Sequence, residues 1–239
     1  MPDDKMLNDE NMATIEENYA RVLASVENAC SRAGRRTKDV HLVAVSKNVT
    51  TDSIIRVFNK GQRMFGENRA QEIRDKMPLL PKDIEWHFIG RLQRNKVKYI
   101  IDGVAMIHSV DSIPLAYEIN RLAVLKNIRM PALIQVNLGG EDTKAGFETS
   151  DLRQCLEEIA KLPGIFIKGL MTIGPYYENP EDSRSLFRAM RVLRDEAASW
   201  DIQGADIRLL SMGMSHDYTI AIEEGADFIR VGSAIFIGR

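Results

Sequence analysis

A lysine at the end of an apolar run is the residue with the clearest chemical potential in this sequence. Lys47 ends the segment HLVAVSK, where a predicted strand gives way to a loop. Side chains alternate along a strand, so Val43, Val45 and Lys47 share one face. If that face is the interior of a barrel, we expect the amine to be shielded from water, which favours the free nucleophile needed for a Schiff base. The alternative is an ordinary solvated lysine at a strand end.

Two short segments near the C-terminus carry groups that bind phosphate. LLSMGMSHD places Ser211 and Gly213 at the end of a predicted strand, and FIRVGSAI does the same with Gly232 and Ser233. Small residues let backbone N–H groups approach a phosphate, and hydroxyl groups add donors. We therefore expect these two turns to hold a phosphate group.

Arg230 lies two residues before Gly232 and shares its face of the last predicted strand. An arginine that points into a barrel needs a partner, because burying an unpaired charge is costly. Two interpretations stay open for this residue. One is an internal ion pair with a carboxylate, and the other is a contact to a ring nitrogen of a cofactor such as pyridoxal phosphate.

The elements that must position these residues alternate between strands and helices along the whole chain. The predicted strands cover residues 41–47, 63–67, 84–90, 104–110, 131–138, 166–174, 207–213 and 227–235. Eight such strands separated by helical segments predict an α/β fold, a single (β/α)8 TIM-type barrel. Active sites of these barrels form at the C-terminal ends of the strands, and phosphate often binds after the seventh and eighth.

An extra helix is predicted before the first strand. Residues 1–12 are polar and are expected to form a flexible tail, and residues 13–239 a single barrel domain. Ile15, Tyr19, Val22, Leu23 and Val26 recur at helical spacing, and Gly34 is a stop signal. We expect this N-terminal helix to cover part of the barrel.

Composition excludes several classes of function. The net charge is −2, which gives no electrostatic basis for binding nucleic acid or an anionic membrane. No apolar run approaches the roughly 18 residues of a membrane span, and the N-terminus is unlike a signal or transit peptide. We expect a cytoplasmic protein. Cys30 and Cys155 are far apart, and His41 and His108 have no metal-ligand spacing, so no disulfide or metal site is expected.

Seven sequence blocks resemble those of a known family. In chain order they are AVSK, FGENRAQE, WHFIGRLQRNK, EDTKAGF, GLMTIG, SMGMSHD and RVGSAIF. The blocks are similar to those of the pyridoxal-phosphate homeostasis proteins (the YggS/PROSC family). This resemblance implies a fold related to the N-terminal barrel of alanine racemase, with pyridoxal 5′-phosphate (PLP) bound as a lysine Schiff base.

The resemblance also implies roles for individual residues. By motif position these are Lys47 for the Schiff base, Ser211, Gly213, Gly232 and Ser233 for the phosphate, Arg230 for the pyridine nitrogen, and Asn68 and His87 around the ring. Lys144, in the EDTKAGF block, is expected to approach the same cavity.

Three functions are compatible with this set of residues. The favoured one is a PLP-binding protein, without turnover of its own, that keeps free PLP low and supplies apo-enzymes, as a monomer or weak dimer. The second is a single-domain PLP-dependent amino-acid racemase with Lys47 as its base. Against it, a pyridine nitrogen facing Arg230 stays unprotonated and is a poor electron sink, and the second domain that completes alanine racemase is expected to be absent. The third is an aldolase-type barrel with a lysine Schiff base, although such aldolases usually carry their lysine on a later strand.

Overall fold

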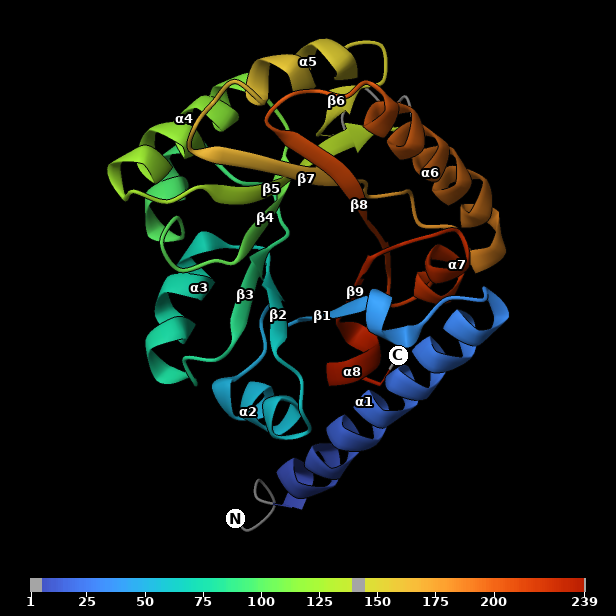
Figure 1. The fold of residues 1–239 in the computed structure, drawn as a ribbon. Coiled ribbons are helices and arrows are strands. Elements are labelled where there is room, and N and C mark those ends of the chain that lie inside the picture. Colours follow the sequence, from blue (N-terminus) through green and yellow to red (C-terminus); the bar gives the residue numbers. More distant parts are fainter. Residues whose placement is uncertain (1–5, 139–144, 239) are drawn as a thin grey trace.

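Parallel strands pair side by side until the last closes against the first (Figure 1). The computed structural model describes residues 6–138 and 145–238, and within them eight strands form the closed ring. These are β1 (His41–Val45), β2 (Met64–Glu67), β3 (Glu85–Phe88), β4 (Met106–Val110), β5 (Met130–Asn137), β7 (Ile165–Met171), β8 (Ala205–Met214) and β9 (Phe228–Val231). A further two-residue strand, β6 (Phe147–Glu148), pairs with β5 alone. The predicted (β/α)8 barrel is confirmed.

Helices surround the ring of strands and connect its members (Figure 1). The α-helices are α1 (Met6–Arg32), α2 (Thr51–Asn59), α3 (Ala70–Lys76), α4 (Ile113–Leu125), α5 (Leu152–Ile159), α6 (Arg184–Ser199), α7 (Tyr218–Glu223) and α8 (Ser233–Phe236). Short 3₁₀ segments occupy Thr37–Asp39, Met77–Leu79, Arg94–Tyr99 and Pro180–Ser183. None of the helices in this described part of the chain is both long and apolar enough to cross a membrane.

Both faces of the strands are buried, as expected for a parallel sheet that is covered on both sides. The outer faces pack with the helices in the main hydrophobic core. The inner faces form a separate, smaller cluster that fills the barrel, made of Val43, Met106, Leu133, Met171 and Phe228. The barrel is therefore a packed core, and the space for a ligand lies at the ends of its strands.

Helix α1 lies across the outside of the barrel, beside α2, α7 and α8 (Figure 1). Its buried stripe contains Ile15, Tyr19, Val22 and Val26, which share one helical face. The helix begins at Met6, so the backbone of residues 6–12 of the predicted tail is helical here. The expected flexibility of that tail stays a prediction.

Several predicted strands end earlier than the sequence suggested, among them the first and the last. The first ends at Val45, because the Val49 N–H donates to the Ser46 carbonyl at 3.0 Å and closes a turn with Asn48 at φ 59°. The last ends at Val231, and Ser233 already begins α8. Ala234 and Ile235 continue the apolar pattern past the last strand, which is why the pattern alone extended it, whereas the polar Ser46 and Lys47 follow the first.

Candidate cofactor-binding site

A cavity of about 700 Å³ lies at the C-terminal ends of the strands. Five residues predicted to contact a cofactor line it, namely Lys47, Asn68, Arg230, Gly232 and Ser233. The closed topology explains their proximity, because β1 and β9 pair although they lie at opposite ends of the chain.

The register between β1 and β9 determines how far along the barrel Arg230 and Gly232 lie relative to the cavity. Val43 pairs with Arg230, and since Val43 belongs to the inner cluster, Arg230 lies on the inner face as well. One step further toward the cavity, a Cβ on Gly232 would lie 3.1 Å from the Cβ of Val45. Glycine at this position lets the end of β9 approach β1 closely.

Lys47 lies in the turn after β1 and lines the cavity, but it is exposed. The expected shielding from water is therefore wrong for this residue in the structure. Its position near the C-terminal end of the first strand agrees with the prediction. The amine can be reached both from solvent and from the cavity.

Arg230 is 5% exposed, and its guanidinium contacts only neutral acceptors. Nη1 donates to the Ser211 hydroxyl at 2.6 Å, and Nη2 donates to the Thr172 carbonyl at 2.8 Å. Among the described residues its hydrogen-bond partners are a hydroxyl and a carbonyl, so the structure does not form the ion pair considered for this residue. Burial lowers the pKa of Arg230 to about 10, and the nearby charge of Asp217 opposes that shift. The side chain stays charged at neutral pH and keeps further N–H donors for a ligand.

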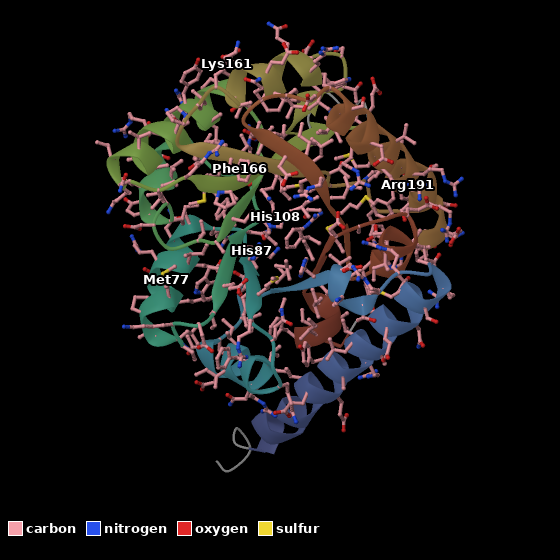
Figure 2. All side chains as sticks on the ribbon, viewed as in Figure 1. Met77, His87, His108, Lys161, Phe166 and Arg191 are labelled. Carbon is pink, nitrogen blue, oxygen red and sulfur yellow. The ribbon has the colours of Figure 1, made fainter. Side chains whose placement is uncertain are left out.

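Behind Arg230, a chain of hydrogen bonds runs through the barrel interior. The His108 Nδ1 lies 2.9 Å from the Ser211 hydroxyl, and its Nε2 lies 2.8 Å from Nδ1 of His87. Figure 2 shows the two histidines next to one another at the centre of the molecule. Burial lowers the pKa of His87 to about 4 and that of His108 well below its ordinary value, so both rings are neutral.

Because the histidines are neutral, His108 can accept a hydrogen bond from Ser211. Its oxygen already accepts a hydrogen bond from Arg230, so its own hydroxyl hydrogen is available to Nδ1 of His108. Ser211 is fully buried, and neither Ser211 nor His87 is among the described residues that line the cavity. Both residues therefore belong to the hydrogen-bond chain that orients Arg230, and neither contacts the cavity itself.

Small residues and hydroxyl groups at the end of β9 form a cradle for an anion, and two backbone amides hold the Ser215 hydroxyl in it. The Ser215 hydroxyl accepts hydrogen bonds from the N–H of Gly232 at 3.0 Å and from the N–H of Ala234 at 3.3 Å. Ser215 lines the cavity, as does the hydroxyl-bearing Ser233. Sequence reasoning missed Ser215, although it lies within the SMGMSHD block.

Gly213, the remaining predicted phosphate residue, does not line the cavity. Its φ is +87°, and a Cβ there would lie 2.5 Å from the Cβ of Ala221 in α7. Glycine at this position serves the backbone conformation and the close packing of β8 against α7. Lys144 lies outside the described residues.

Two further groups face the cavity in ways that suit a ring-shaped ligand. Tyr176 and His216 stack with centroids 4.9 Å apart at the mouth, and sequence reasoning missed Tyr176. The Oδ1 atom of Asn68 is buried and has no hydrogen-bond partner among the described residues. A donor on a ligand would satisfy that oxygen.

The set of groups fits PLP. An amine, a buried guanidinium, an unpartnered acceptor and a cradle with two hydroxyl groups line one cavity. PLP carries an aldehyde, a ring nitrogen, a phenolic hydroxyl and a phosphate, for which these groups are matched partners. Among the described residues, no group of three or more His, Cys, Asp or Glu side chains could hold a metal ion.

Comparison with known proteins agrees with this reading of the cavity. Residues 19–239 match the family described as alanine racemase, N-terminal domain. A pyridoxal phosphate homeostasis protein of Aquifex aeolicus is 47% identical over 221 residues, covering 92% of this chain and 96% of the relative.

Solved structures of similar fold and sequence include one with PLP bound. A protein of unknown function from Bifidobacterium adolescentis is similar with a TM-score of 0.90 and 36% identity, over 95% of this chain and 96% of that one. PipY from Synechococcus elongatus PCC7942, solved with PLP bound, is similar with a TM-score of 0.78 and 36% identity, over 89% of this chain and 99% of that one.

Proposed function

Since this chain belongs to the pyridoxal phosphate homeostasis protein family, which is related to the N-terminal barrel of alanine racemase, we propose that it binds PLP as a Schiff base on Lys47. It holds and delivers the cofactor within the cell. One observation carries this proposal. Lys47, Arg230 and the cradle at Gly232, with the hydroxyls of Ser215 and Ser233, line the same cavity.

Lys47 supplies the covalent attachment. Its nitrogen attacks the aldehyde carbon of PLP, an N–C bond forms, and the aldehyde oxygen leaves as water. The reaction is reversible, so the addition of water releases both the free amine and the aldehyde. Exposure of Lys47 at the cavity mouth gives water the access that release requires.

The other groups hold the remaining parts of the cofactor. The hydroxyls of Ser215 and Ser233 bind the phosphate, and the N–H groups of Gly232 and Ala234 hold the Ser215 hydroxyl in place. Asn68 accepts a hydrogen bond from the ring hydroxyl through its unpartnered oxygen.

Arg230 faces the ring nitrogen and makes the site a poor catalyst. A guanidinium donates to an unprotonated nitrogen, and an unprotonated ring draws electrons away from a carbanion only weakly. Ser211, His108 and His87 keep Arg230 in place through neutral hydrogen bonds. The protein therefore carries PLP without turnover of its own.

The wider setting follows from this role. The protein works in the cytoplasm as a monomer or weak dimer and passes PLP to apo-enzymes that use it. A carrier of this kind keeps a reactive aldehyde bound while leaving it transferable. The expected role of Lys144 at the cavity is also retained as part of this proposal.

Trapping the Schiff base tests the proposal. Borohydride reduction of the PLP-loaded protein, followed by peptide mapping, is expected to place the pyridoxyl group on Lys47. Lys47→Ala is expected to abolish the absorbance of the bound cofactor, and Lys161→Ala, an exposed lysine after α5 (Figure 2), is expected to retain it. A pyridoxyl group on any other lysine would contradict the assignment.

The second candidate function is an amino-acid racemase, which the match to the alanine racemase domain favours. The interconversion of L- and D-alanine by the PLP-loaded protein is expected not to exceed that of free PLP, because the ring nitrogen faces Arg230. Chiral chromatography of the reaction mixture measures this directly. Turnover far above free PLP would make the chain an enzyme.

A further inference from the structure

A buried ionic cluster lies behind the turn that carries Lys47. We call it the Lys76 cluster, and it consists of Lys76, Glu67 and Glu72. The Lys76 ammonium donates to Glu67 Oε1 at 2.7 Å, to Glu72 Oε2 at 2.8 Å and to the Ser46 carbonyl at 2.8 Å. An ammonium has three N–H donors, so all of its donors are used.

The same carboxylates hold both chain neighbours of Lys47. Glu67 Oε1 accepts a hydrogen bond from the Ser46 hydroxyl at 2.7 Å. Glu72 Oε2 accepts one from the Asn48 backbone N–H at 2.9 Å. The backbone on either side of Lys47 is thus tied to the end of β2 and to α3.

The cluster is shielded from solvent but lies apart from the cavity. The side chain of Glu67 is fully buried and that of Lys76 is 13% exposed. Glu67 is two residues from Phe65, which belongs to the outer core, so both point away from the barrel interior. None of the three residues is among the described residues that line the cavity. The cluster therefore acts on a ligand only through the turn.

The conformation of the Lys47 turn depends on the Lys76 ammonium, which is the shared cation of the cluster. Two carboxylates share Lys76, and burial raises the pKa of Glu67 while Lys76 opposes that shift. Removing the ammonium would leave Glu67 and Glu72 without their shared cation, and the Ser46 carbonyl without its donor.

We propose that Lys76, Glu67 and Glu72 are positioning residues that fix the Lys47 turn where its amine meets the aldehyde carbon of PLP. This inference rests on the function proposed above and extends it to the rate of bond formation. The bond forms between the Lys47 nitrogen and the aldehyde carbon, with loss of water. Misplacing a reacting group by 1 Å can cost about 100-fold in rate, so we expect a loosened turn to slow this step by at least about 10-fold.

Two variants of the full chain test the inference, with one matched control. Lys76→Met keeps a long apolar stem and removes the ammonium. Glu72→Ala removes the acceptor of the Asn48 N–H while Lys76 keeps Glu67, and its partly exposed position makes folding less dependent on it. Lys161→Met, at an exposed site far from the turn, is the control.

The experiment mixes each protein with PLP and follows the absorbance of the Schiff base in a stopped-flow instrument. A competition titration with inorganic phosphate reports on the cradle at Gly232. We expect both cluster variants to form the Schiff base at least about 10-fold more slowly. We also expect their phosphate affinity to stay within about twofold of wild type, because none of the cluster residues lines the cavity that contains the cradle.

The outcomes separate this inference from the proposed function. A wild-type protein that forms no Schiff base defeats the function itself. Wild-type rates in Glu72→Ala and in folded Lys76→Met overturn the positioning role alone. An equal loss of phosphate affinity and of rate also overturns it, because that would be general unfolding of the site. If Lys76→Met does not fold, Glu72→Ala decides by the same two measurements.

Discussion

At the scale of single residues, the buried polar groups beside the cavity are held by neutral partners. Arg230 donates to a hydroxyl and a carbonyl, and the two histidines behind it are uncharged. A guanidinium with neutral partners keeps its full charge directed toward whatever occupies the cavity. A carboxylate in the same place would have neutralised it.

The buried histidines predict how stability depends on pH. His87 and His108 bind protons more readily in the unfolded chain than in the folded protein, so stability is lost as pH falls from the unfolded pKa near 6.5 toward the folded value of about 4 for His87. Between pH 7 and pH 5, His87 alone is expected to cost about 2 kcal/mol of unfolding free energy. Urea unfolding at the two pH values measures the loss.

A neutral replacement isolates the contribution of His87. His87→Gln is expected to reduce the loss between pH 7 and pH 5 by about 2 kcal/mol. His216→Gln, at an exposed histidine, is the matched control. An identical loss in wild type and His87→Gln would show that His87 does not titrate in this way.

Two site residues were predictable from their position in the last strand or directly after it. Arg230 and Gly232 line the cavity as expected, since position along a strand fixes which end and face they occupy. Asn68 also lines it, but it was expected from the family resemblance alone. The exposure of Lys47 was not predictable, because it depends on a turn closed by Ser46 and Val49. The placement of Ser211, outside the cavity, depends on contacts with residues far away in the sequence.

At the scale of elements, the connection from β8 to α7 shows how closely strand and helix pack beside the cavity. Gly213 is at φ +87°, and Asp217 accepts a hydrogen bond from the Met214 N–H at 2.6 Å just before the helix begins. Strand β8 ends at Met214, and α7 starts at Tyr218. The residues between form the turn that brings the Ser215 hydroxyl to the amides after β9.

Alanine substitutions at Gly213 and Gly61 distinguish the free-energy cost of backbone strain from the cost of a steric clash. Gly213→Ala is expected to destabilise the protein by about 3 kcal/mol, from a left-handed backbone and a clash with Ala221. Gly61→Ala has a similarly positive φ of +103° but no atom within 4 Å of the added Cβ, so about 1 kcal/mol is expected. Chemical denaturation compares the two. Equal losses would mean that the close packing against α7 contributes nothing.

At the scale of the whole molecule, the alternation of strands and helices was enough to predict the barrel. Eight predicted strands match the eight that close the ring, although their ends differ by several residues. The sequence did not reveal β6, because a two-residue strand has no periodicity. Nor did it reveal which helices α1 contacts, since only the closed ring brings α2, α7 and α8 to one side.

Helix α1 is expected to contribute substantially to overall stability. Val22 is 3% exposed on its buried stripe, and the adjacent Leu23 is 41% exposed. Val22→Ala is expected to lower the free energy of unfolding by about 2 kcal/mol, from lost burial and a small cavity. Leu23→Ala, the matched control, is expected to cost less than about 0.5 kcal/mol in the same urea titration. Similar losses for both would show that α1 does not pack as described.

The plug of side chains inside the barrel has a consequence for traffic through the protein. The barrel axis is blocked by the buried side chains of Val43, Met106, Leu133, Met171 and Phe228. A ligand therefore has to enter and leave through the same opening of the cavity. Arrival and departure cannot then occur at once. A recipient protein that takes the ligand directly would have to bind at this opening of the cavity. While it is bound, a second ligand molecule could not enter from solution.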